Sequence, residues 1–233
     1  MNFIIITIAI VIGCNAIGFI YSYLVLYTNL FKEKRIQHRD YKPGLFFKRL
    51  PLILLNLFLL LAITCTGLYF IADRFIMDFP PVWVIALQVL AYFLIDDLWF
   101  YFIHRWLHEN KYLMKTIHAI HHKAIMPFPL EYIYVHPLEW MIGSIGTFIG
   151  LGFFMWIGGG HAYAITFWLF IALRNLHEIE IHSDVKSWIG DKIPLLAPTE
   201  HHDLHHARSK GNYASTLLIW DKFFGTELKA PKK

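Results

Sequence analysis

The sequence predicts an all-α integral membrane bundle of about four to five membrane segments, one of them a hairpin, with a histidine-rich helical cap in the cytosol. Apolar residues make up 57% of the 233 positions and charged residues only 16%, whereas soluble domains are about half apolar and a quarter charged. Thirteen of the fourteen histidines lie between His104 and His206. This composition excludes an ordinary water-soluble enzyme and leaves the concentration of imidazole to be explained.

Long apolar runs define the expected membrane segments. Residues 2–30 carry no Lys, Arg, Asp or Glu, and such a helix is long enough to cross a hydrocarbon core of about 30 Å. The other expected segments are residues 50–72, a helix from Val82 that carries Asp96 and Asp97 near its end, and the runs 140–157 and 163–173. Three consecutive glycines, 158–160, separate the last two runs, which predicts a hairpin with a short second arm.

The charge pattern predicts the orientation. Seven Lys and Arg residues against two acidic ones lie in the segment 32–49, and such a cluster stays on the cytoplasmic side. The three histidine motifs then share the cytoplasmic face, where they can converge into one site. The two cysteines lie within apolar runs and offer no thiolate metal site. The basic residues lie beside apolar segments, so nucleic acid is not expected as a partner.

The histidines recur at the spacing of ligands on helices. His104 and His108 are four residues apart, and Asp97 precedes His104 by seven, which places all three on one helix face. The other two motifs, H-A-I-H-H and H-H-D-L-H-H, share an i, i+3, i+4 pattern: His118, His121 and His122, and His202, His205 and His206. Without thiolates, an all-imidazole site suits a borderline metal such as ferrous iron. Eight or more histidines exceed the needs of one ion, which predicts two.

Other protein classes explain these features less well. A non-catalytic metal transporter or histidine-rich sensor, the main alternative, would need polar residues threaded through the first two spans, which have almost none. A membrane metalloprotease would need a carboxylate inside a motif such as H-E-x-x-H. The only H-E pairs, at 108–109 and 177–178, lack the second histidine at that spacing.

The motif order H-x-x-x-H, H-x-x-H-H, H-x-x-H-H after an apolar N-terminal half resembles the fatty acid hydroxylase and sterol desaturase superfamily of membrane di-iron oxygenases. The resemblance extends from about Asp96 to Glu227. It is closest in detail to the sterol 4-methyl oxidase branch, through E-Y-I-Y-V-H-P-L-E and E-H-H-D-L-H-H-A-R-S-K-G-N-Y-A-S. It implies one membrane-embedded oxygenase domain over residues 1–233, with 1–95 mainly a transmembrane anchor and 96–227 the catalytic region.

The resemblance also implies which side chains bind metal. The matched positions are His104, His108, His118, His121, His122, His202, His205 and His206. A further ligand is expected from the segment before the last motif, where His182 fits best and His177 is the alternative. His136, in H-P-L-E, is a ligand or a group that supports one. Asp97 and Asp203 are expected to act at the site by fixing a ligand tautomer, although a buried acid such as Asp97 can instead cap backbone.

The implied chemistry is oxidation of a lipid. Two iron ions, for which zinc can substitute in purified protein, would use dioxygen to hydroxylate or desaturate a C–H bond of a sterol or fatty acyl chain in the membrane. These outcomes share one metal site and stay open. No flavin or nicotinamide fingerprint is present in the sequence, so electrons are expected from a separate donor such as cytochrome b5 or ferredoxin with its reductase.

Overall fold

Long helices dominate the computed structural model, which describes residues 2–190 and 192–228. Residues 1, 191 and 229–233 of the expected domain lie outside the described residues. Within that description, four segments are long and apolar enough to cross a membrane: α1 (Asn2–Tyr27), α2 (Leu45–Tyr69), α3 (Val82–Glu109) and the stretch Pro137–Ile157, which comprises α5 (Pro137–Gly143) and α6 (Ile145–Ile157). The predicted all-α membrane bundle is therefore confirmed.

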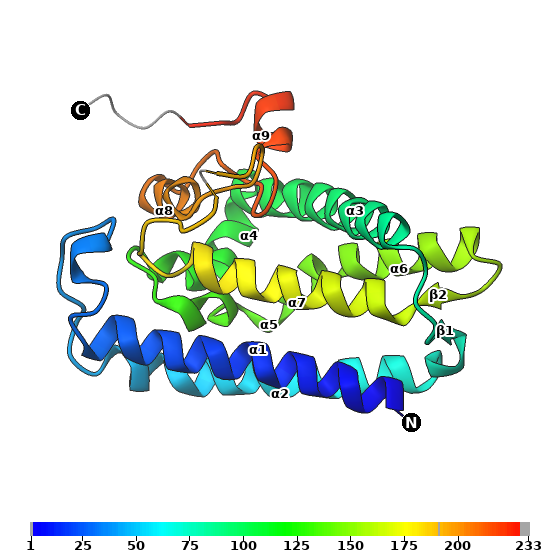
Figure 1. Cartoon of the computed structure of the whole chain (residues 1–233). Coiled ribbons are helices and arrows are strands. Elements are labelled where there is room, and N and C mark those ends of the chain that lie inside the picture. Colours follow the sequence, from blue (N-terminus) through cyan, green and yellow to red (C-terminus); the bar gives the residue numbers. More distant parts are fainter. Residues whose placement is uncertain (1, 191, 229–233) are drawn as a thin grey trace.

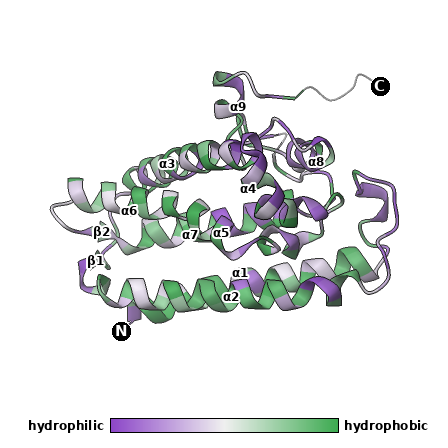
Figure 2. Cartoon of the chain, turned by 180° about the vertical axis from the view of Figure 1, so that it is seen from behind, coloured by the Kyte–Doolittle hydropathy of each residue, from purple (hydrophilic) through white to green (hydrophobic). Residues whose placement is uncertain are grey.

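The fifth long helix, α7 (Ala164–Ile181), runs through the middle of the bundle between α1 and α3 (Figure 1). It packs against both, and α6 packs along α3. Figure 2 shows hydrophobic residues along these helices and hydrophilic residues gathered mainly at the end that carries α4 (Lys111–Thr116) and α8 (Thr199–Arg208). The bundle thus ends in a polar cap.

The second arm of the expected hairpin is longer than the sequence suggested. Residues 163–173 were the predicted arm, but α7 is an 18-residue helix that continues to Ile181. Its C-terminal half carries polar side chains, including Arg174, that lower its hydropathy, and burial against partners on other helices makes those side chains tolerable. Beyond the turn at Gly159 and Gly160, both with positive φ, the strands β1 (Phe75–Ile76) and β2 (Ala162–Tyr163) pair in parallel and join the two far-side turns.

Short helices complete the described chain. They are the 3-10 helices η1 (Lys32–Lys34), η2 (Ala72–Arg74), η3 (His118–Lys123) and η4 (Pro129–Ile133), and the α-helix α9 (Ile219–Phe223). The buried Phe128, Leu130 and Ile133 of the η4 region pack with Ile53 of α2 in one apolar core, and η4 also contacts α1 and α7. The N-terminal helices are therefore packed directly against the histidine-rich half of the chain.

A buried ion pair fastens this junction. Arg49 Nε lies 2.9 Å from Glu131 Oε1, and both side chains are nearly inaccessible. Arg49 also donates to the Lys123 carbonyl at 3.1 Å and lies 4.1 Å from the Tyr134 ring centroid. Burial raises the pKa of Glu131 to about 7, and the Arg49 charge opposes that rise. Arg49, a member of the predicted basic cluster, thus takes part in the packing of the bundle.

Arg49→Met is expected to lower the free energy of unfolding by about 3 to 5 kcal/mol, because it leaves Glu131 buried without its partner. Thermal unfolding of the detergent-solubilised protein measures the change. Lys48→Met removes the same type of charge from the exposed neighbouring position and should leave the melting temperature nearly unchanged. Equal losses in the two variants would show that Arg49 acts only through surface charge.

Candidate metal centre

Nine histidines form two adjacent groups at the polar end of the bundle. In each group, one nitrogen from every ring lies within 4.8 Å of the others. The five-histidine group consists of His104, His108, His118, His122 and His205. The four-histidine group consists of His121, His182, His202 and His206. The structure thus brings together side chains from α3, η3, α8 and the end of α7.

The two H-H pairs each divide between the groups. His122 and His205 belong to the five-histidine group, whereas their neighbours His121 and His206 belong to the four-histidine group. Each i, i+3, i+4 motif therefore contributes histidines to both groups and not to one alone. In α8, successive residues point about 100° apart, so the adjacent His205 and His206 reach different groups. The rings of His122 and His206, which belong to different groups, are 5.1 Å apart between centroids, so the two groups are adjacent.

Hydrogen bonds to fixed acceptors set the tautomers of three rings. Backbone carbonyls accept from Nδ1 of His104 (Tyr213 O, 2.7 Å), His205 (Gly211 O, 2.7 Å) and His182 (Glu178 O, 2.8 Å). A carbonyl cannot donate, so Nδ1 carries the hydrogen and Nε2 keeps its lone pair. Nε2 of each ring is thereby left free to bind a metal ion, and the ring orientation is fixed.

The free nitrogens of the five-histidine group converge on one another. His108 Nε2 lies 2.8 Å from His118 Nε2 and 3.2 Å from His205 Nε2, and His122 Nε2 is 3.0 Å from His118 Nε2. His104 Nε2 is buried with no hydrogen-bond partner among the described residues. Converging lone pairs repel unless a cation lies among them. The donor set therefore fits a bound metal ion.

The four-histidine group has the same character. His202 Nε2 lies 3.0 Å from His182 Nε2 and 3.1 Å from His206 Nε2, and His121 is the fourth member. All four side chains are buried. Four imidazoles match the coordination number of a closed transition-metal site. The histidines thus supply enough donors for two ions without a carboxylate.

Burial keeps these rings neutral. Desolvation, reinforced by neighbouring histidines, lowers the pKa of His121, His202 and His206 well below the ordinary value. The same causes lower the pKa of His205 well below that value, and desolvation lowers the pKa of His122 to about 3. Neutral imidazole is the form that binds metal, so the centre is ready to bind metal at neutral pH.

His177 and His136 lie outside both groups. His177 Nε2 bonds the Ser215 carbonyl at 3.1 Å, and His136 Nδ1 caps α5 by accepting from the Leu138 backbone at 3.2 Å. Of the alternatives that the sequence left open for the last ligand, only His182 lies within a group.

Asp97 and Asp203 contact other parts of the chain than expected. Asp97 accepts hydrogen bonds from the backbone N–H groups of Ser215, Thr216 and Leu217 at 2.8 to 3.1 Å. Asp203 Oδ1 accepts from the Gln37 side chain at 2.7 Å. Neither acid bonds a histidine in the described part of the chain, so the tautomer role is corrected. Asp97 caps backbone, the alternative left open, and it holds the loop that follows Tyr213.

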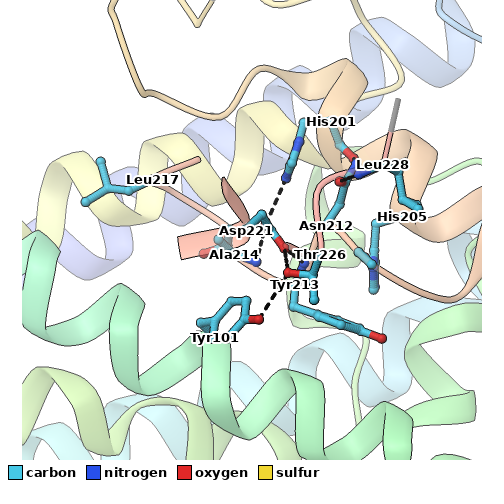
Figure 3. A network of polar contacts seen from close by, with 12 residues as sticks. Tyr101, His201, His205, Asn212, Tyr213, Ala214, Leu217, Asp221, Thr226 and Leu228 are labelled. Atoms are coloured by element: carbon cyan, nitrogen blue, oxygen red, sulfur yellow. Dashed lines mark hydrogen bonds and ion pairs between the residues drawn. The ribbon is translucent and has the colours of Figure 1, made fainter. Parts of the chain in front are cut away.

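A third acid organises that loop. Asp221 accepts from the backbone N–H groups of Tyr213 and Ala214 at 2.8 and 2.9 Å, and from Thr226 Oγ1 at 2.7 Å (Figure 3). His201 Nε2 lies 3.2 Å from the same carboxylate. The C-terminal segment therefore closes over the centre and fixes the Tyr213 carbonyl that supports His104.

Glu139 is the supporting residue that sequence reasoning missed. Its Oε1 lies 2.8 Å from His118 Nδ1, and both side chains are buried. The signal was the glutamate of H-P-L-E, a motif from which only His136 was predicted to act at the site. A carboxylate behind a ligand histidine fixes the ring and raises its basicity.

Glu139→Ala is expected to lower metal affinity by about 10- to 100-fold, because the His118 ring loses the partner that orients it. Competition with a calibrated chelator on the purified full chain measures the loss. His136→Asn, in the same motif, keeps a capping side chain and should leave affinity unchanged. Equal affinities in wild type and Glu139→Ala would contradict the supporting role.

An internal cavity of about 180 Å³ reaches the centre from the apolar part of the bundle. Its walls come mainly from α1, α2, α5, α6 and α7, and they are largely apolar. Members of both groups border it: His104, His121, His182 and His202. A lipid chain in this cavity would have its end next to the histidines.

A bundle of membrane-spanning length that directs two all-histidine groups at a largely apolar cavity has the side chains of a membrane metal-binding protein. The chain belongs to the fatty acid hydroxylase family, whose model matches residues 89–226. It is therefore a lipid oxygenase, which confirms the predicted enzyme class and superfamily and sets aside the transporter or sensor alternative.

Curated relatives agree with this assignment. Methylsterol monooxygenase 1 of Rattus norvegicus is 34% identical over 228 residues, which are 92% of this chain and 75% of the relative. Methylsterol monooxygenase erg25B of Aspergillus fumigatus is 37% identical over 65% of this chain and 51% of its own length. Very-long-chain aldehyde decarbonylase GL1-11 of Oryza sativa subsp. indica is 37% identical over 68% of this chain and 59% of its own length. The chain thus spans little more than half of the last two. No solved structure matches.

Proposed function

We propose that this protein is a dioxygen-dependent di-iron enzyme that hydroxylates a C–H bond of a membrane lipid, and that this lipid is a sterol. The observation that carries the proposal is the pair of all-histidine groups at the end of an apolar cavity. The printed names of the relatives from rat and Aspergillus fumigatus support a methylsterol substrate. Desaturation at the same centre is the competing outcome.

The nine clustered histidines would hold one iron in each group. When bound, the iron pair would activate dioxygen for attack on a saturated C–H bond, because no protein side chain can oxidise such a bond by itself. The protein's own task is to hold the rings and exclude water. Backbone carbonyls and Glu139 hold the rings through Nδ1, and the apolar cavity walls keep bulk water away from the reacting carbon.

The distribution of basic residues supports a membrane orientation for the centre and a docking surface for the electron donor. We place the centre on the cytoplasmic side, since the basic segment 32–49, which runs into the start of α2, lies at the same end of the bundle as α8 (Figure 1). Cytochrome b5 or ferredoxin with its reductase would supply the electrons. Arg35 and Arg49 of that segment are buried, and Arg35 donates to the Val25 carbonyl. Exposed residues such as Lys32, Lys42 and Lys48 remain available to an acidic carrier.

Reconstitution tests the proposal. The full chain in lipid vesicles, supplied with ferrous iron, dioxygen, cytochrome b5 and its reductase, is offered a 4-methyl sterol and separately a fatty acyl lipid. Mass spectrometry should show the gain of one oxygen atom on the sterol. Loss of two hydrogens would replace hydroxylation by desaturation. Unchanged lipids with iron bound would contradict the proposed activity.

A further inference from the structure

One face of α7 forms a wall of the cavity from its apolar part to the metal centre. Phe167, Ile171, Arg174, Glu178 and His182 all line the cavity, and their spacing of four, three, four and four residues keeps them on one helix face. Arg174 precedes His182 by eight residues, or about 12 Å along the helix axis. Two charged side chains therefore lie in this wall between apolar residues and a member of the four-histidine group.

Arg174 is held in place by an ion pair that leaves N–H groups of its guanidinium available. Its Nε donates to Asp96 Oδ2 of α3 at 2.6 Å, and Thr147 Oγ1 donates to the other oxygen of Asp96 at 2.8 Å. Asp96 neutralises the guanidinium, which makes its place inside the bundle tolerable. No hydrogen bond from the Arg174 terminal Nη atoms is found within residues 2–190 and 192–228. Those N–H groups are available on a side chain that lines the cavity.

Glu178 supplies an acceptor one helical turn closer to the centre. The residue is only 7% exposed, and its Oε1 is buried without a partner among the described residues. His182 does not satisfy it, because the His182 Nδ1 hydrogen goes to the Glu178 backbone carbonyl at 2.8 Å, and the carboxylate lies 3.9 Å away. A buried carboxylate oxygen without a donor is costly, so this atom points to a missing ligand.

We propose that Arg174 and Glu178 bind a hydroxyl group of the lipid that occupies the cavity. The hydroxyl oxygen accepts from an Arg174 N–H, and the hydroxyl hydrogen goes to Glu178 Oε1. A carboxylate ligand would meet like charge at Glu178, and a ketone would bring no hydrogen for it. Only a group that both accepts and donates satisfies the two side chains.

This inference rests on the proposed function and deepens it by naming the two side chains that recognise the hydroxyl group of the lipid. The hydroxyl would lie within about one to two helical turns of His182. The carbon presented to the centre is then one close to the carbon that carries the hydroxyl. Arg174 and Glu178 are binding residues in this role, and metal binding does not require them.

Equilibrium binding without reductant tests the inference apart from oxidation. The full chain in vesicles is titrated with a radiolabelled sterol alcohol and with its 3-deoxy counterpart. Wild type should bind the alcohol at least about tenfold more tightly, as expected for hydrogen bonds to charged groups. Glu178→Leu should abolish the preference. Arg174→Gln combined with Asp96→Asn removes the guanidinium without leaving an unpaired acid, and should abolish it too.

Glu180→Leu is the matched control, since Glu180 lies on the same helix but accepts from Ser187 and Trp188 outside the cavity lining. It should keep the preference, and metal content should equal wild type in every variant. Equal affinities of wild type for the two sterols would overturn the inference, as would an unchanged preference in Glu178→Leu. If the preference behaves as expected but no oxidised product forms in the reconstituted system, the proposed oxidation fails and the alcohol site stands.

Discussion

His202→Ala is expected to lower bound iron from about two ions per chain to about one and to abolish lipid oxidation, while the chain still inserts and folds. His202 Nε2 is the contact shared by His182 and His206 in the four-histidine group. Its loss leaves three imidazoles in that group and removes no member of the five-histidine group. Iron content of the purified variant by mass spectrometry, together with product formation in vesicles, measures both effects.

Two comparisons sharpen this result. His201→Asn changes the adjacent histidine, which bonds Asp221 and lies outside both groups, and should keep about two ions. His205→Ala leaves four imidazoles in its group, so it should lose less metal than His202→Ala even though oxidation stops. If His201→Asn loses as much iron as His202→Ala, the effect of both is on folding and the ligand assignment fails. Two retained ions in an active His202→Ala protein would also contradict it.

Local spacing made much of the centre predictable. Each helical motif fixes its own relative ring positions over one turn, so His104 with His108, and His202 with His206, could be read from the sequence alone. In α8 the same geometry could have predicted that His205 and His206 serve different groups, because adjacent residues of an α-helix diverge by about 100°. His121 and His122 lie in a 3-10 helix instead, to which α-helical spacing does not apply.

Contacts between distant segments were beyond local spacing. Asp97 bonds backbone groups more than a hundred residues away, and nothing in its own neighbourhood distinguishes that from a bond to histidine. Glu139 and His118 are 21 residues apart in the sequence, and only the folded chain brings their side chains together. The end of α7 was predicted too early for a related reason. A charged residue such as Arg174 indicates the end of an apolar segment, and its buried ion pair with Asp96 cannot be deduced from the local sequence.

Gly143→Trp is expected to lower lipid oxidation by about 100-fold or more, while iron content stays at the wild-type level. Gly143 lines the cavity, and a Cβ added there would lie 3.5 Å from the Phe100 ring, an ordinary contact. An indole extends beyond that point into the space a lipid would occupy. Product formation in vesicles, measured beside iron content, separates blocked access from a damaged centre.

Gly152→Trp is the matched control, because Gly152 is exposed on α6 and an added Cβ there meets nothing within 4 Å. It should retain both iron and activity. Gly143→Ala adds only the tolerated methyl group and should reduce oxidation little, so the effect should grow with side-chain volume. Because the cavity borders both histidine groups, blocking it denies substrate to the whole centre. Undiminished oxidation in Gly143→Trp would mean that the lipid reaches the irons by another route.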